Sequence, residues 1–184
     1  MTDPTPETDP TAATPPSSLE DRRGSARIEL ADDGSSYECV RTFGAPPERV
    51  FRAFTNPDDL RVWFPTGAPP GSEMTVCESD PVEGGRYRYV MVIPEHGTMS
   101  WHGEYTLVER PERLGAREWF VMGDDDPTGA PATQVLTFEA TGRGSTLMTM
   151  RVDLPDPEDP ETFVEQSAAG LQSSLAALDE LVSS

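Results

Sequence analysis

Few residues in this sequence are suited to acid–base chemistry, and Glu118 is the foremost of them. In an expected strand over residues 117–122, Glu118 shares a face with Phe120, and this register would turn both side chains inward. Burial and a neighbouring arginine can tune a carboxyl group in a closed pocket, so Glu118 could serve as a general acid or base. The simpler alternative is a solvated or ion-paired strand residue.

The histidines and cysteines suggest little further chemistry. His102 lies in an expected strand, where alternation turns it away from the face of Trp101, and His96 falls in a turn. Cys39 and Cys77 lie in separate strands without a C-x-x-C spacing, so we expect buried free thiols. The sequence also lacks G-x-S-x-G, H-E-x-x-H and Gly-rich phosphate-loop motifs. We therefore expect no metal, no cofactor and no nucleophilic catalysis.

Aromatic side chains form the more promising functional set, because several fall on one face of consecutive strands. Tyr87, Tyr89 and Met91 alternate with other residues in one strand, and Trp101 and Tyr105 do so in the next. Tyrosine hydroxyls on a buried face need hydrogen-bond partners or water, which favours a partly polar cavity over a dry core. Filling of the core is the alternative for each of these residues.

A long amphipathic helix at the end of the chain is the element that must cover these strands. Its apolar residues recur at spacings of three and four: Val164, Ala168, Leu171, Leu175, Leu178 and Val182. Asp159 is the expected N-cap, and Pro160 is the first helical residue. Gly170 costs roughly 1 kcal/mol relative to alanine inside a helix, which indicates close approach of the sheet or of a ligand there.

The chain before this helix predicts strands and two short helices. We expect strands over residues 26–30, 36–43, 74–78, 86–91, 99–109, 117–122, 134–140 and 145–154. Alternation within 99–109 puts Leu107 on the face of Trp101 and Tyr105. One short helix begins at Pro47, and Asn56 caps a second one. Antiparallel strands with one polar face can be covered on the other by a single helix, and a cavity between helix and sheet is then expected.

Composition separates an N-terminal tail from one domain. Residues 1–24 are rich in proline, threonine and acidic residues, with only Met1 and Leu19 as large apolar side chains, which predicts a disordered tail. Residues 25–184 fit a single domain. Neither a signal peptide nor an apolar run of membrane-spanning length is visible, so we expect a soluble, cytoplasmic protein.

The charge balance bears on partners. The net charge is −19, so we expect neither nucleic acid nor a membrane as partner. All 14 basic residues are arginine. A GC-rich genome and adaptation to high salt are alternative explanations for the absence of lysine. The sequence leaves a homodimer open.

A series of loose motifs occurs in order between residues 36 and 182. They are Arg41-Thr42-Phe43, the run from Ala45 to Phe54, Asn56-Pro57, Leu60 with Trp63-Phe64, Gly84-Gly85-Arg86-Tyr87, Gly103-Glu104-Tyr105, Pro111-Glu112-Arg113-Leu114, and Gly170-Leu171 with Leu175 and Leu178. In this order they resemble the START and birch-pollen-allergen-like superfamily (SRPBCC), and within it the family named after the activator of the heat-shock protein 90 ATPase homologue. At Phe64 and Leu171, members of that family often carry tryptophan, which indicates a roomier pocket here.

The resemblance implies an α+β helix-grip fold, in which a curved antiparallel sheet of about six to seven strands wraps around the long C-terminal helix, with two short helices after the first strand. It also implies binding of a hydrophobic small molecule, aromatic or lipid-like, and we expect this without catalysis. The expected ligand-binding residues are Trp63, Phe64, Tyr87, Tyr89, Met91, Trp101, Tyr105, Glu118, Phe120, Phe138, Met148, Met150 and Leu171. The alternatives are a cyclase or hydrolase that uses acid–base residues in the same cavity, and a co-chaperone-like protein that regulates an ATPase.

Overall fold

The computed structural model describes residues 26–184 except 124, 143 and 156–159. The expected tail over residues 1–24 and the expected N-cap Asp159 lie outside the described residues. The described elements are β1 (Arg27–Leu30), β2 (Ser36–Phe43), α2 (Pro47–Thr55), α3 (Pro57–Trp63), the 3-10 helix η1 (Phe64–Gly67), β3 (Glu73–Ser79), β4 (Arg86–Ile93), β5 (Gly97–Glu109), β6 (Arg113–Met122), β7 (Ala132–Thr141), β8 (Ser145–Asp153) and α4 (Pro160–Val182).

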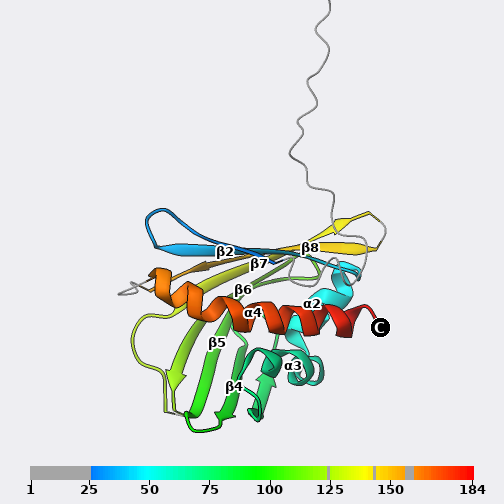
Figure 1. Ribbon diagram of the computed structural model, residues 1–184. Helices are drawn as coiled ribbons and strands as arrows, with labels where there is room; N and C mark the ends of the chain where they lie inside the picture. Colours follow the sequence, from blue (N-terminus) through cyan, green and yellow to red (C-terminus); the bar gives the residue numbers. More distant parts are fainter. Residues whose placement is uncertain (1–25, 124, 143, 156–159) are drawn as a thin grey trace, which may run out of the picture.

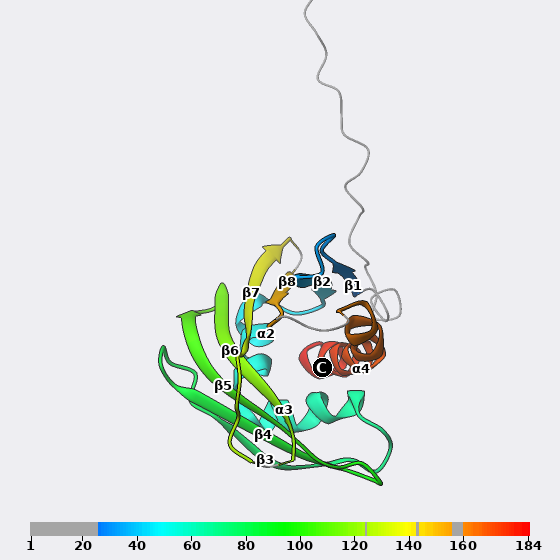
Figure 2. The ribbon, with the colours of Figure 1, turned by 90° about the vertical axis from the view of Figure 1, so that its left-hand side faces the viewer.

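The strands form one antiparallel sheet in the order β1-β2-β8-β7-β6-β5-β4-β3. Figures 1 and 2 show this sheet curving around α4, with α2 and α3 at one end. The expected α+β helix-grip fold is therefore confirmed. The described sheet has eight strands rather than about six to seven, because all eight ranges expected as strands join the same sheet.

Alternation along the strands divides the sheet into an inner face, turned toward α4, and an outer face. On β4, for example, Tyr87, Tyr89 and Met91 are buried on the inner face, whereas Arg86 and Val92 are exposed on the outer face. This confirms the expected direction of the β4 side chains, since successive residues of a strand point to opposite faces.

A β-bulge on β5 corrects one expectation. The register between β5 and β6 shifts between Tyr105 and Leu107, so Val108, and not Leu107, packs against the core. The extra residue of a bulge reverses the alternation beyond it. Leu107 was therefore wrongly expected to share the face of Trp101.

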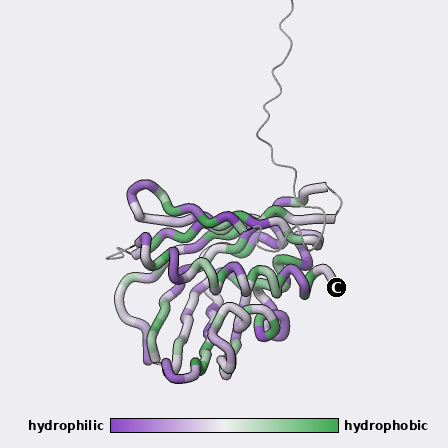
Figure 3. The backbone as a smooth tube through the Cα atoms, in the orientation of Figure 1, coloured by the Kyte–Doolittle hydropathy of each residue, from purple (hydrophilic) through white to green (hydrophobic). Residues whose placement is uncertain are grey.

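Only the second half of α4 is buried. Leu175, Leu178 and Val182 are buried, whereas none of residues 160–170 is. The backbone of α4 lies closest to η1, α3, α2, β1 and β2. Purple and green segments alternate along α4 in Figure 3, as an amphipathic helix requires. The apolar stripe of α4 therefore has a close-packed part and a half-buried part that begins at Val164.

Gly170 marks the contact between α4 and η1. A Cβ atom on Gly170 would lie 2.9 Å from the carbonyl oxygen of Gly67, and one on Gly67 would overlap the carbonyl of Gly170. One turn further along α4, the Ser174 hydroxyl donates a hydrogen bond of 3.0 Å to the carbonyl of Phe64. The close approach expected at Gly170 is thus made by η1, and not by the sheet or by a ligand.

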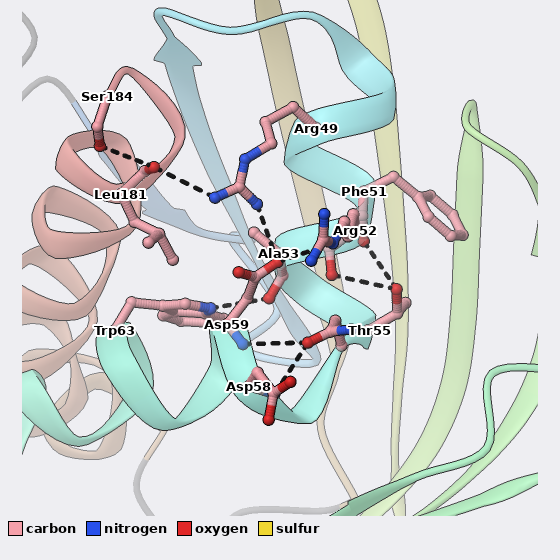
Figure 4. A network of polar contacts seen from close by, with 11 residues as sticks. Arg49, Phe51, Arg52, Ala53, Thr55, Asp58, Asp59, Trp63, Leu181 and Ser184 are labelled. Atoms are coloured by element: carbon pink, nitrogen blue, oxygen red, sulfur yellow. Dashed lines mark hydrogen bonds and ion pairs between the residues drawn. The ribbon is translucent and has the colours of Figure 1, made fainter.

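Polar contacts fix the two short helices to the end of α4 (Figure 4). Arg49 on α2 donates from Nη1 to Oδ2 of Asp59 on α3 at 2.9 Å, and from Nη2 to the carbonyl of Leu181 on α4 at 3.2 Å. Trp63 donates its indole N–H to the carbonyl of Ala53 at 2.8 Å. These bonds hold α2, α3 and the end of α4 as one unit.

The cap at Asn56 is as expected. Its side-chain oxygen accepts from the backbone N–H groups of Asp58 at 2.9 Å and Asp59 at 3.2 Å. Asparagine in this position satisfies amide groups that have no partner within the helix. The same residue ends α2 and begins α3, which sets the turn between them.

A buried ion pair joins β2 to α4. Nη2 of Arg41 lies 3.8 Å from Oδ2 of Asp179, and both side chains are fully buried. Oδ1 of Asp179 also accepts from the backbone N–H of Gly44 at 3.0 Å and from the hydroxyl of Ser183 at 3.2 Å. The second half of α4 is thereby fixed to the sheet by charge as well as by apolar packing.

Among the described residues, no helix is long and apolar enough to cross a membrane.

Candidate ligand-binding site

A polar cluster lies on the otherwise apolar inner face, and the strand register creates it. Tyr87 on β4 faces Gly103 on β5, which faces Glu118 on β6. A Cβ atom on Gly103 would overlap the ring of Tyr87, so this ring lies across the glycine. The Tyr87 hydroxyl thereby donates a hydrogen bond of 2.7 Å to Oε2 of Glu118. Only glycine permits such a close approach within a strand.

Gln134 on β7 completes this cluster. Its Nε2 donates to the Tyr87 hydroxyl at 3.0 Å and, in a longer bond of 3.5 Å, to Oε2 of Glu118. We call Tyr87, Glu118 and Gln134 the Glu118 cluster. Since Gln134 pairs with Ala116, the neighbour of Glu118 on the same face, the register of β6 and β7 brings the amide to the carboxylate.

Burial is the main influence on the pKa of Glu118. Loss of hydration raises the pKa of its carboxyl group above the ordinary 4.5, although the bonds from Tyr87 and Gln134 act in the opposite direction. Both bonds end on Oε2, and Oε1 has no donor among the described residues. The side chain is half-buried, so a ligand can approach it.

The neighbouring tyrosines are hydrogen-bond donors and stacking partners. The rings of Tyr87 and Tyr89 stack at 4.9 Å between centroids, and the hydroxyl groups of Tyr89 and Tyr105 are hydrogen-bonded. The Tyr105 hydroxyl lies 2.9 Å from that of Ser79. Burial, and secondly the negative charge of Glu118, raises the pKa of Tyr87 well above 10.0. These phenols therefore stay protonated at neutral pH.

An aromatic row leads from the core to the surface beside this cluster. Ring centroids are 5.2 Å apart for Phe64 and Trp101, and 5.3 Å apart for Trp101 and Phe120. We call these three residues the aromatic row. Phe64 and Trp101 are half-buried, and Phe120 is 49% exposed although it faces inward. Met122, the next inner residue of β6, is 61% exposed. The inner face is thus uncovered at this end of β6.

The family model for "Activator of Hsp90 ATPase homolog 1-like protein" matches residues 44–183. The chain belongs to this family. No curated protein matches the sequence. The match begins eight residues later than the resemblance over residues 36–182 and ends at the same helix, so the family expected from the ordered motifs is confirmed.

Solved structures show the same fold. A protein from Mycobacterium smegmatis has a TM-score of 0.72 at 23% identity, over 85% of this chain and 95% of its own. One from Rhodobacter sphaeroides has a TM-score of 0.71 at 28% identity, over 85% of this chain and 97% of its own. A Plasmodium falciparum protein described as an HSP90 activator has a TM-score of 0.58 at 18% identity, over 80% of this chain and 95% of its own.

The residues expected to bind ligand fall into two groups in this family member. Those with accessible surface are Trp101, Glu118 and Phe120 on the inner face of the sheet, Phe64 on η1 and Leu171 on α4. Those that are buried are Trp63, Tyr87, Tyr89, Met91, Tyr105, Phe138, Met148 and Met150. The tyrosines of the second group reach the site through their hydroxyl groups or by stacking, whereas its other members pack in the core.

Phe138 and Trp63 illustrate the core positions. The ring of Phe138 lies 5.7 Å from that of Phe51 and 5.5 Å from that of Phe54, both on α2. The indole N–H of Trp63 is bonded to the carbonyl of Ala53. These contacts place both residues beneath the short helices, away from the uncovered end of β6.

Three contributors were missing from the expected site. Gln134 and Gly103 build the Glu118 cluster, and the half-buried Tyr37 lies close enough to Glu118 for the carboxylate to help burial raise its pKa. Two sequence signals could have found Gly103 and Gln134. One is a glycine inside a strand, and the other is a glutamine two residues before Leu136, on the same apolar face.

The described cavities do not enclose this site. A cavity of about 510 Å³ lies between α2 and the loops at Pro81 and Pro111, with Phe51, Arg52 and Arg110 among its lining. Beneath the first half of α4, between Tyr37 and Leu171, the cavity is only about 10 Å³, room for about one water molecule. The Glu118 cluster and the aromatic row therefore lie outside both of these cavities.

Other chemically active groups lie elsewhere. His102 is paired with Arg88 and Trp119 across the strands and is on the outer face, where its Nε2 lies 3.2 Å from the hydroxyl of Ser100. Cys39 and Cys77 are free and buried, as expected. Within the described ranges, no group of three His, Cys, Asp or Glu side chains could hold a metal ion.

Proposed function

We propose that this protein binds a hydrophobic small molecule, aromatic or lipid-like, on the inner face between the first half of α4, the start of β5 and the end of β6. The aromatic row supplies the apolar surface, and the Glu118 cluster supplies the polar contact. The observation that carries the proposal is the exposure of Phe120, which is 49% accessible although it points toward the concave side of the sheet.

Contact of the apolar Phe120 side chain with water is unfavourable, and a bound ligand that covers the side chain removes this contact. Burying a phenylalanine side chain contributes about 1.5–3 kcal/mol. The second half of α4 is buried against the core, whereas Phe120 and Met122 at the end of β6 stay exposed. A mostly apolar concave surface with a few fixed polar groups is typical of small-molecule sites.

Binding without catalysis fits the groups that surround Glu118. Its partners are a phenol and an amide, and the raised pKa of Tyr87 keeps that phenol protonated, so it is not available as a base. The competing candidate is an acid–base enzyme on the same face, favoured by the raised pKa of Glu118. Conversion of a bound compound into a product, lost in Glu118→Gln, would establish that candidate.

Regulation of an ATPase is the third candidate, because one structural neighbour is described as an HSP90 activator. An identity of 18% shows the fold alone. Addition of this protein to a purified HSP90-type ATPase tests the role, and an unchanged ATPase rate removes it.

Fluorescence titration with the neutral apolar probe N-phenyl-1-naphthylamine tests the binding proposal. We expect saturable binding that Phe120→Ser weakens about tenfold, equivalent to about 1.4 kcal/mol. The matched control is Val92→Ser, which removes a 44% exposed apolar side chain from the outer face of β4. Equal loss in both variants, or binding that Phe120→Ser leaves unchanged, would remove the site from the inner face. Phe120 suits this test better than the buried Tyr89 because its replacement leaves the core intact.

A further inference from the structure

We propose that the ligand of this site carries an ammonium group that binds to Oε1 of Glu118, so that the preferred class is aromatic or long-chain amines rather than neutral or acidic lipids. This inference rests on the proposed binding function and specifies the chemistry of the ligand. Three features of the inner face support it: the orientation of the carboxylate, the charges around it and the rings beside it.

The carboxylate has one oxygen held and one available. Oε2 accepts from Tyr87 at 2.7 Å and from Gln134 at 3.5 Å, which holds this oxygen in place. Oε1 has no donor among the described residues, and the half-buried side chain is accessible. A ligand that donates a hydrogen bond can therefore complete the set, whereas a ligand with only acceptors leaves Oε1 without a partner.

The charges on the inner face favour a cation. Among the described residues, no arginine forms an ion pair with Glu118. The other charged inner-face residue of the strands, Arg41, is fully buried beside Asp179. A fatty acid bound here would thus bring a second carboxylate close to Glu118, which no described arginine pairs, and like charges at short range repel. The first turns of α4 add Glu161 and Glu165, both exposed.

The aromatic row provides surfaces suited to the same cation. Phe120 follows Glu118 by two residues on one face of β6, which places their Cα atoms roughly 6–7 Å apart. Trp101 pairs with Phe120 across the strands. A cation within about 6 Å of a ring centroid is attracted by the ring face, most strongly for tryptophan. One amine can therefore contact the carboxylate while its apolar part packs on the aromatic row.

Isothermal titration calorimetry at pH 7.5 with three naphthalene probes of similar size tests this inference: 2-(2-naphthyl)ethylamine, 2-(2-naphthyl)ethanol and the carboxylate 2-(2-naphthyl)acetate. We expect the amine to bind about tenfold more tightly than the alcohol, equivalent to about 1.4 kcal/mol, and the acetate to bind most weakly. Glu118→Gln should bring the amine to the affinity of the alcohol. The matched control, Glu48→Gln, removes an exposed carboxylate that lines the other cavity and should change none of the three.

The outcomes separate the two proposals. If the alcohol binds and the amine binds no more tightly, the ammonium inference is overturned and the binding function still stands. The same holds if the amine preference persists in Glu118→Gln. Such a persistent preference would reflect the net charge of −19 alone. Failure of all three probes to bind would count against both. Because the comparison of probes uses the unaltered protein, an absent amine preference overturns the inference even if Glu118→Gln folds poorly.

Discussion

The hydroxyl of Tyr87 reaches across Gly103 to donate a hydrogen bond of 2.7 Å to Glu118, so residues on β4 and β6 are joined over the strand between them. The bond places a carboxyl group of raised pKa on an apolar face, beside aromatic rings that α4 leaves uncovered. A protein rarely keeps such a group for stability, because burial disfavours its charged form. Its position is explained if a ligand uses it.

The first prediction concerns pH. Since the folded-state pKa of Glu118 is raised, its contribution to stability is fully present below the ordinary pKa of 4.5 and is lost as the pH rises through the folded value. Glu118→Gln has no such loss. We expect its melting temperature to exceed that of the wild type at pH 8 and to approach it at pH 4, in calorimetric scans. A difference in melting temperature between variant and wild type that is equal at pH 8 and pH 4 would contradict this. So would the same pH dependence in Glu48→Gln.

The second prediction concerns Gly103. Gly103→Ala introduces a Cβ atom that overlaps the ring of Tyr87, and we expect a loss of about 1–3 kcal/mol in urea unfolding. In a Tyr87→Leu background the loss should shrink by about 1 kcal/mol or more, because the two positions are in contact. Gly142→Ala, where an added Cβ meets nothing within 4 Å, is the control. Additive losses would show that the ring does not lie over the glycine.

The third prediction concerns the buried pair of Arg41 and Asp179. Asp179→Asn leaves the arginine charge buried without its carboxylate, which should cost about 3–5 kcal/mol in urea unfolding. Replacing both residues, as Arg41→Met with Asp179→Leu, should recover part of this loss. Asp153→Asn, in an exposed pair with Arg151, should cost about 1 kcal/mol or less. Equal effects at Asp179 and Asp153 would contradict the role assigned to the buried pair.

The fourth prediction concerns Gly170. Alanine usually stabilises a helix interior by about 1 kcal/mol relative to glycine. Here Gly170→Ala should instead destabilise by about 1–3 kcal/mol, because the added Cβ lies 2.9 Å from the backbone of Gly67. Ser173→Ala, at an exposed position on the same helix, should change the free energy of unfolding by about 0.5 kcal/mol or less. A gain in stability from Gly170→Ala would mean that η1 and α4 lie further apart.

Much of the fold could be predicted from the sequence because local patterns determine it. The spacing of Leu175 and Leu178 identifies the helix, and alternation assigns Tyr87 and Tyr89 to the inner face. The orientation of Leu107 was predicted wrongly because the bulge depends on the pairing of β5 with β6, which alternation within one strand cannot reveal.

The site was less predictable because it depends on distances between elements. The stripe on α4 shows which side of the helix is apolar, but it does not show that Leu175 packs closely while Val164 stays half-buried. Gln134 reaches Glu118 through the register of β6 and β7, which the sequence does not state. Trp63 is aromatic and inward, yet its bond to Ala53 assigns it to the core.

Native mass spectrometry of the protein, purified without added ligand, tests the inner-face site most directly. We predict a retained adduct of defined mass in the wild type and in Val92→Ser, and its loss in Phe120→Ser. An adduct that remains in Phe120→Ser would place the ligand elsewhere, with the cavity beside Arg110 as the next position to test. A clean mass for the wild type, together with no thermal shift from aromatic or lipid-like compounds, would contradict ligand binding itself.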